Sequence, residues 1–316
     1  VTLAGTLTVP RGVGPFPAAI LISGSGAQDR DETIFEHKPF LVISDYLTRR
    51  GVAVLRFDDR GVGESSGAGV LANSTSENFA RDVQAGIDFL KTQDRIDATR
   101  IGLIGHSEGG MIAPLVATNG GDVAFIVSLA GPGVDGATIL STQTRAGLEA
   151  AGLPNDFVDA NVRIMYAIFN MILADEPATA DEIKKTAAEI AGGYDEETTK
   201  QIEQGMQAMG NMFASAWMEY FVNFEPSTVW CKVQCPVLAM NGEKDLQVLV
   251  DINLDGIEKA LRDGGNKHFK ILRLPNMNHL FQETDGPGLG SEYGQLEQTF
   301  SPQALQAMGD WLESIL

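Results

Sequence analysis

The residues best suited to chemistry form the pentapeptide Gly-His-Ser-Glu-Gly at 105–109, which follows a short apolar run. That run, 101–104, predicts a buried strand, and the small and apolar residues of 110–117 predict a helix. A serine between a strand and a helix, with glycine two positions to either side, is typical of a nucleophile elbow. Glycine lacks the Cβ that would crowd such a turn, and N–H groups at a helix start favour developing negative charge. Since this context argues against a chance match, we predict Ser107 as the nucleophile.

A serine hydroxyl needs a base, and the chain contains four histidines. His279 is the predicted base because it follows a predicted strand, 268–274, and so lies at the carboxyl edge of a parallel sheet, where ligands bind. His37 belongs to an early loop, His268 begins the strand at the opposite edge, and the side chain of His106 is expected to point away from the attack geometry. The alternative for His279 is an ordinary surface histidine.

The base in turn needs an orienting carboxylate, which we predict to be Asp245. Asp245 follows a predicted strand through a short turn, and its expected role is to fix the tautomer of His279. The chain order Ser107, Asp245, His279 is the order expected for α/β-hydrolases. Glu243 is the neighbouring rival for the role and Asp135 the distant one.

An oxyanion hole requires two backbone N–H groups near the serine. One is predicted to come from Glu108, the residue after the nucleophile, and the other from the glycine-rich loop that follows strand 16–23. In that loop Ser25 is the first choice and Gly26 the second. A flexible turn is the alternative; phosphate binding is disfavoured because the G-x-G-x-x-G spacing and a P-loop lysine are both missing from the loop.

The elements that position these residues alternate strand and helix, which predicts a parallel sheet covered on both faces. Residues 1–10 alternate apolar and polar and predict a half-buried strand at the sheet edge. The remaining predicted strands are 16–23, 52–57, 101–104, 124–129, 237–240 and 268–274, and the helices are 39–50, 76–93, 110–117, 251–263 and one opened by Ser301-Pro302.

This alternation stops between 134 and 228, where only helices are predicted, at 154–174, 181–192 and 196–222. We interpret 134–228 as a helical cap inserted into a core formed by 1–133 and 229–316. Methionines are concentrated in the insertion, and packing is favoured over a ligand pocket as their role. They are Met165, Met171, Met206, Met209, Met212 and Met218.

The overall composition limits the partners. The chain of 316 residues carries 42 acidic and 23 basic residues, a net charge of −19, without a Lys/Arg cluster, so nucleic acid and anionic membranes are not expected partners. No apolar run is long enough to span a bilayer. A zinc or EF-hand pattern is missing from the sequence, so we predict no metal and no cofactor. The oligomeric state is left open.

The compartment is also left open. The chain begins at Val1 without a targeting signal, so we expect a soluble protein, either cytoplasmic or exported after removal of an upstream segment. Cys231 and Cys235 do not decide the redox environment, since a packed thiol is favoured at Cys235 and a local disulfide is the alternative.

Five charged residues follow the early strands: Arg30, Asp31, Asp58, Asp59 and Arg60. They are interpreted as ion pairs that brace loops rather than as catalytic groups.

Several separated segments together resemble bacterial α/β-hydrolase esterases of the serine-esterase D type, which are related to serine aminopeptidase-like hydrolases. The resemblance implies the α/β-hydrolase fold, a mostly parallel sheet with helices on both faces, a helical cap, and carboxylesterase activity on small, short-acyl esters. In one departure, Ser23 stands where many α/β-hydrolases have histidine before the oxyanion residues. The segments are 23–26, 29–32, 57–65, 105–110, 235–238, 241–248 and 278–282.

The leading hypothesis is therefore a serine carboxylesterase that works through an acyl-enzyme on Ser107. A peptidase, amidase, thioesterase or lactonase would use the same triad, and acidic residues of the cap could bind the amine of a peptide terminus. A binding protein on this scaffold is the third hypothesis, and the complete set of Ser107, Asp245 and His279 argues against it.

Overall fold

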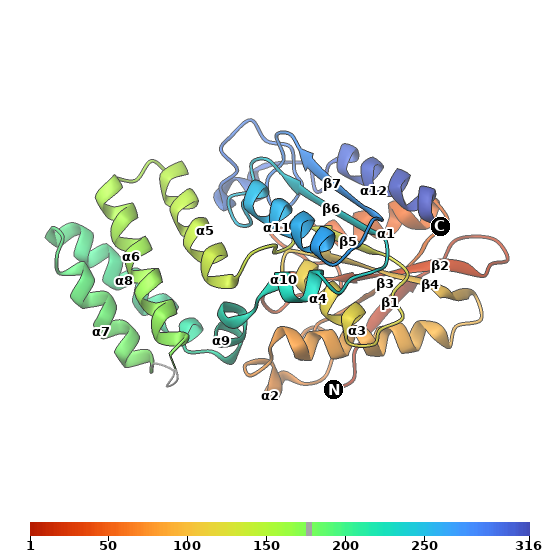
Figure 1. Ribbon diagram of the computed structural model, residues 1–316, viewed down its shortest axis with the longest axis horizontal. Helices are drawn as coiled ribbons and strands as arrows, with labels where there is room; N and C mark the ends of the chain where they lie inside the picture. Colours follow the sequence, from red (N-terminus) through yellow and green to blue (C-terminus); the bar gives the residue numbers. More distant parts are fainter. Residues whose placement is uncertain (175–178) are drawn as a thin grey trace.

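Residues 1–174 and 179–316 are described by a computed structural model, and across them seven strands form one sheet in the order β1-β3-β2-β4-β5-β6-β7 (Figure 1). Strands β2 to β7 pair in parallel, whereas β1 pairs antiparallel with β3 at the edge. The predicted α/β class with a mostly parallel sheet is confirmed. The strands are β1 Gly5–Thr8, β2 Phe16–Ile22, β3 Ala53–Phe57, β4 Ile96–His106, β5 Ile126–Leu129, β6 Val237–Gly242 and β7 Phe269–Leu274.

Helices cover both faces of this sheet because its central strands are apolar on both sides. Along β2, Ala18 and Ile20 belong to a hydrophobic cluster shared with α3, α4, α10 and α11, while Ala19 and Leu21 belong to one shared with α1 and α12. The helices are α1 Pro39–Arg49, α3 Ser76–Lys91, α4 Glu108–Thr118, α10 Pro226–Trp230, α11 Val250–Asp263 and α12 Pro302–Ile315, with short helical turns α2 Ala68–Leu71 and η1 Gly290–Gln295.

Between β5 and α10 the chain leaves the sheet and forms a helical segment with a hydrophobic cluster of its own. Figure 1 shows this segment to one side of the sheet, in green. Its helices are α5 Gly136–Ala150, α6 Asn155–Ile172, α7 Ala180–Ala191, α8 Glu196–Phe213 and α9 Ala216–Asn223.

Two predictions for this segment were wrong. Helix α5 was missed, although Asp135 caps it by accepting the N–H of Thr138 at 2.8 Å. The single helix expected over 196–222 is broken before α9, where the Ser215 hydroxyl accepts the Met218 N–H at 3.2 Å. A side chain that satisfies the N–H groups of a new helix start favours such a break.

Candidate active site

Ser107 lies at the sharp turn between β4 and α4. Its φ of 52° and ψ of −118° are strained for a residue with a side chain, and its N–H donates to the Leu129 carbonyl at 2.9 Å. A Cβ at Gly105 would collide with the Gly109 carbonyl oxygen, and one at Gly109 would collide with the carbonyl of Ile22. The turn therefore requires glycine at both positions, as the spacing of the elbow motif predicted.

Asp245 and His279 lie on neighbouring loops, after β6 and β7, and are in contact. Nδ1 of His279 lies 2.8 Å from Oδ2 of Asp245, and the two residues are only 4% and 2% exposed. The other carboxylate oxygen accepts the N–H groups of Gln247 and Val248 at 2.8 and 2.9 Å. An ionised carboxylate only accepts hydrogen bonds, so Nδ1 carries the proton and Nε2 is left as the acceptor of His279.

The rival carboxylates have other surroundings. Glu243 is exposed to solvent, and Asp135 is occupied as the cap of α5. Of the other histidines, His268 is exposed, and His37 contacts the Thr299 hydroxyl and the Tyr293 carbonyl.

The loop after β2 runs directly against the nucleophile. A Cβ at Gly24 would lie 3.2 Å from the Cβ of Ser107, which shows how closely this backbone approaches. Of the predicted oxyanion residues, Ser25 and Glu108 line one cavity together with Ser107, and Gly26 has a φ of 104° that lets the loop turn.

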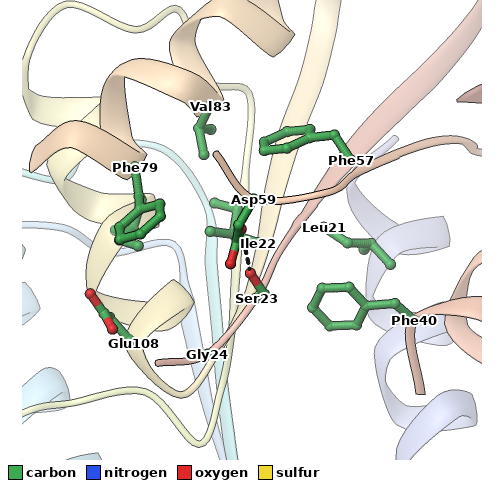
Figure 2. A pocket seen from close by; sticks show the side chains of 11 residues that line it. Leu21, Ile22, Ser23, Gly24, Phe40, Phe57, Asp59, Phe79, Val83 and Glu108 are labelled. Carbon is green, nitrogen blue, oxygen red and sulfur yellow. Dashed lines mark hydrogen bonds between the residues drawn. The ribbon is translucent and has the colours of Figure 1, made fainter. Parts of the chain in front are cut away.

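Asp59 holds this loop from behind. Its two carboxylate oxygens accept the Ser23 hydroxyl at 3.1 Å and the Gln28 N–H at 3.0 Å. Figure 2 shows Asp59 and Ser23 joined beside a small cavity of about 20 Å³, which Glu108 also lines. Burial raises the pKa of Asp59 to about 7, against the weaker opposite effect of these hydrogen bonds.

Glu108 connects the elbow to the helical segment. Its buried carboxylate accepts the Ser76 hydroxyl at 2.6 Å, the indole N–H of Trp217 in α9 at 2.9 Å, and a hydrogen bond from the Ser25 side chain. Burial raises the pKa of Glu108, and these three neutral donors act against that increase.

A second carboxylate–imidazole contact, Glu32 with His106, lies beneath the oxyanion loop. Oε1 of Glu32 accepts the Gly24 N–H at 2.7 Å and lies 3.0 Å from Nδ1 of His106, whose Nε2 is 3.0 Å from the carbonyl oxygen of His279. Neither residue is among the predicted site residues, because only the folded chain brings Glu32 and His106 together.

The other charged residues near this edge brace loops, as predicted. Arg30 pairs with Asp58 at 2.7 Å, Arg56 pairs with Asp31, and Arg60 pairs with Asp82 at 2.8 Å. Asp59 differs, since its two partners are a neutral hydroxyl and a backbone N–H.

A cavity of about 800 Å³ opens above Ser107 and His279, between the sheet edge and the helical segment. The helical segment contributes mostly apolar and aromatic side chains to its wall, among them Ile139, Leu140, Phe213, Trp217 and Phe221. Met165 and Met218 are buried in the hydrophobic cluster of the helical segment, as packing predicts, and together with the more exposed Met212 they also line the cavity. The side chains of Met206 and Met209 lie outside the described residues.

The family model described as serine aminopeptidase, S33, matches residues 38–190. Esterase EstD from Thermotoga maritima is 26% identical over 294 residues, which are 92% of this chain and 61% of EstD, so the chain spans about three fifths of that relative. Alpha/beta hydrolase GrgF from Penicillium sp. sh18 superposes with a TM-score of 0.54 at 17% identity, over 99% of this chain and 93% of GrgF. This chain therefore has the α/β-hydrolase fold.

A further structural neighbour is Est1E from Butyrivibrio proteoclasticus, solved with ferulic acid bound. It has a TM-score of 0.55 and 16% identity, and the match covers 99% of this chain and 93% of Est1E. The resemblance to serine-esterase D proteins and to serine aminopeptidase-like hydrolases, expected from the sequence, is confirmed by the family model and EstD.

Among residues 1–174 and 179–316, His, Cys, Asp and Glu side chains do not gather in threes with the geometry of a metal site. In the same part of the chain, none of the helices combines the length and apolarity required to cross a bilayer. Cys231 and Cys235 are free thiols, and burial raises the pKa of Cys235 to about 11.

Proposed function

We propose that the protein is a serine carboxylesterase that hydrolyses small, short-acyl esters with Ser107, His279 and Asp245 as its catalytic triad. The observation that carries the proposal is the pairing of His279 Nδ1 with Asp245, which leaves Nε2 as a base in the same cavity as the strained Ser107.

In the proposed reaction, the Ser107 hydroxyl attacks the ester carbonyl carbon while Nε2 of His279 takes its proton. The N–H groups of Ser25 and Glu108 bind the oxyanion, with the Gly26 N–H as the alternative to Ser25. The tetrahedral intermediate expels the alcohol, which receives the proton from His279, and an acyl-enzyme remains on Ser107. Water then attacks with His279 again as the base, and the carboxylic acid leaves.

The helical segment is proposed to act as a cap, with 134–228 inserted into a core of 1–133 and 229–316. The side chains that it adds to the cavity wall are mostly apolar, which suits an uncharged acyl or alcohol group. A volume of about 800 Å³ accommodates a short acyl group together with its alcohol.

A peptidase is the second candidate, because the family model is described as a serine aminopeptidase and because Glu32 and Glu108 line the cavity. Both carboxylates already accept internal hydrogen bonds, Glu32 from Gly24 and Glu108 from Ser76 and Trp217, which favours esters. If the protein hydrolyses an aminoacyl p-nitroanilide faster than p-nitrophenyl esters, a peptidase becomes the better candidate than an esterase.

The test is hydrolysis of p-nitrophenyl esters from acetate to decanoate by the protein and by Ser107→Ala. We expect turnover of the short esters, and background rates in the variant with its fold preserved. A variant that retains most of the activity would exclude Ser107 as the nucleophile. Labelling of Ser107 by a fluorophosphonate without ester turnover would support the triad but mean that the substrate is not one of these esters. Absence of both labelling and turnover would favour a binding protein.

A further inference from the structure

The contact between Glu32 and His106 joins the two loops that the reaction must hold in register. On one side, Glu32 accepts the N–H of Gly24, the residue before Ser25. On the other, His106 contacts the backbone carbonyl of His279, the proposed base. Glu32 and His106 are 4% and 6% exposed, so solvent does not compete for these bonds.

The hydrogen-bond partners determine where the protons lie. A carbonyl oxygen only accepts, so Nε2 of His106 must carry a proton to bond to the His279 carbonyl. A carboxylate also only accepts, so a second proton must lie between Nδ1 of His106 and Oε1 of Glu32. Because the same Oε1 also accepts the Gly24 N–H, it acts as a carboxylate acceptor toward both donors, and this second proton is placed on the ring.

We propose that Glu32 and His106 form a buried carboxylate–imidazolium ion pair that positions the oxyanion loop and the catalytic histidine of the proposed esterase. This inference rests on the proposed function for its effect on rate, but the protonation state of His106 is independent of it. Both are positioning residues, because although they line the cavity their side-chain hydrogen bonds go to Gly24, to each other and to the His279 backbone.

The surroundings of His106 favour the charged ring. Burial lowers its pKa, but the charge and hydrogen bond of Glu32, the carbonyl of His279 and the charge of Asp245 outweigh this, and the pKa is raised. The rings of His279 and Phe281 face it, with 4.8 and 6.4 Å between the centroids.

Glutamine cannot replace Glu32 in this arrangement. The same atom, Oε1, meets both the Gly24 N–H and the His106 ring. With a neutral amide in place of the carboxylate, the ring loses its counter-charge and reverts to one proton, which is needed at Nε2 for the His279 carbonyl. Nδ1 then presents a lone pair to the amide oxygen, and the contact becomes repulsive.

The first experiment compares Glu32→Gln with Asp82→Asn, which breaks another buried ion pair, Arg60–Asp82, whose described hydrogen bonds reach neither loop. We expect kcat of Glu32→Gln for a short p-nitrophenyl ester to fall about 10- to 100-fold with KM within about twofold, because the oxyanion N–H acts mainly in the transition state. Asp82→Asn should lower the unfolding temperature with kcat within about twofold. A Glu32→Gln variant with unchanged kcat would overturn the proposal.

The second experiment reads His106 directly by ¹⁵N NMR of histidine-labelled protein, in which there are four histidines to assign. Both ring nitrogens of His106 should give protonated signals from pH 6 to just above 7, beyond the point where an ordinary imidazole loses its second proton, assigned by their loss in His106→Gln. A neutral ring over this range would overturn the ion pair even if Glu32→Gln fails to fold. If the intact protein hydrolyses no ester, the proposed function fails while this measurement still decides the ion pair.

Discussion

Two carboxylate–imidazole pairs lie side by side in this molecule, Asp245 with His279 and Glu32 with His106. Their N···O distances are 2.8 and 3.0 Å, and all four residues are buried. The difference lies at the second ring nitrogen. In His106 it bonds to a backbone carbonyl, whereas His279 lines the cavity above Ser107. The ring of His279, whose second nitrogen faces the cavity, can therefore exchange a proton. The ring of His106, whose second nitrogen is bonded to a carbonyl, is expected to keep both of its protons.

The largest expected effect comes from removing the charge of the proposed catalytic pair. In Asp245→Asn the amide can donate to Nδ1, which places the proton of His279 on Nε2 and removes the base. We expect kcat to fall by about 10³- to 10⁴-fold, in steady-state assays of the folded variant. This exceeds the expected effect of Glu32→Gln because only His279 takes part in proton transfer.

Glu243→Gln is the matched control, two residues away on the same loop and exposed to solvent. It should leave kcat within about twofold. A larger loss of kcat in Glu243→Gln than in Asp245→Asn would assign the orienting role to Glu243. The Asp245–His279 contact would then have no catalytic role to compare with the Glu32–His106 contact.

Much of the sheet and the position of the candidate site could be predicted from the sequence because both depend on local patterns. The buried run 101–104, the glycines around Ser107 and the placement of Asp245 and His279 after strands are visible without a structure. Parallel strands bring their carboxyl ends to one edge, so these residues had to meet there.

The second pair could not be predicted in this way. Glu32 and His106 are 74 positions apart, and neither belongs to a pattern that predicts their contact. Glu32 has a φ of 52°, a conformation that the surrounding fold imposes and that no propensity for glutamate would suggest. The helical segment was predicted less well for a related reason, because α5 and the break before α9 depend on single capping residues, Asp135 and Ser215.

Asp59 extends the comparison to a buried carboxylate with neutral partners. Its pKa is raised to about 7, mainly by burial, from an ordinary value of 3.8. Between about pH 4 and 7 the folded protein therefore binds more protons at this site than the unfolded chain, and its contribution to stability falls as the pH rises through that window. Glu32 faces the proposed His106 imidazolium, whereas the side-chain hydrogen bonds of Asp59 come from neutral donors.

Asp59→Asn should therefore remove part of the pH dependence of stability. We expect the variant to have nearly the wild-type free energy of unfolding at pH 5 and to be more stable by up to about 2 kcal/mol at pH 8, measured by urea denaturation. Asp58→Asn is the neighbouring control. The pKa of Asp58 is lowered to about 2 by its hydrogen bond from Arg30, so this variant should be less stable at both pH values. Equal pH dependence in Asp59→Asn and wild type would contradict the assignment.

The smallest expected effect concerns Glu108, whose Trp217 bond ties the elbow to the helical segment. Trp217→Phe removes the indole donor, while a phenyl ring can retain the stacking on Phe221, whose centroid lies 4.9 Å away. The loss of one donor to a buried carboxylate should lower stability by about 1 kcal/mol. Because Trp217 lines the cavity, we expect KM to rise a few fold with kcat within about threefold.

Trp217→Phe is thus expected to change KM more than kcat, whereas Glu32→Gln is expected to lower kcat with little change in KM. Trp311→Phe, on α12 at the opposite face of the sheet, should lower stability without changing KM. A tenfold fall in kcat with unchanged KM in Trp217→Phe would mean that the neutral donors of Glu108 position the oxyanion N–H groups as strictly as the Glu32–His106 ion pair does. The cation on His106 would then be one of two equivalent ways to hold the loop, because a neutral set of donors would do the same.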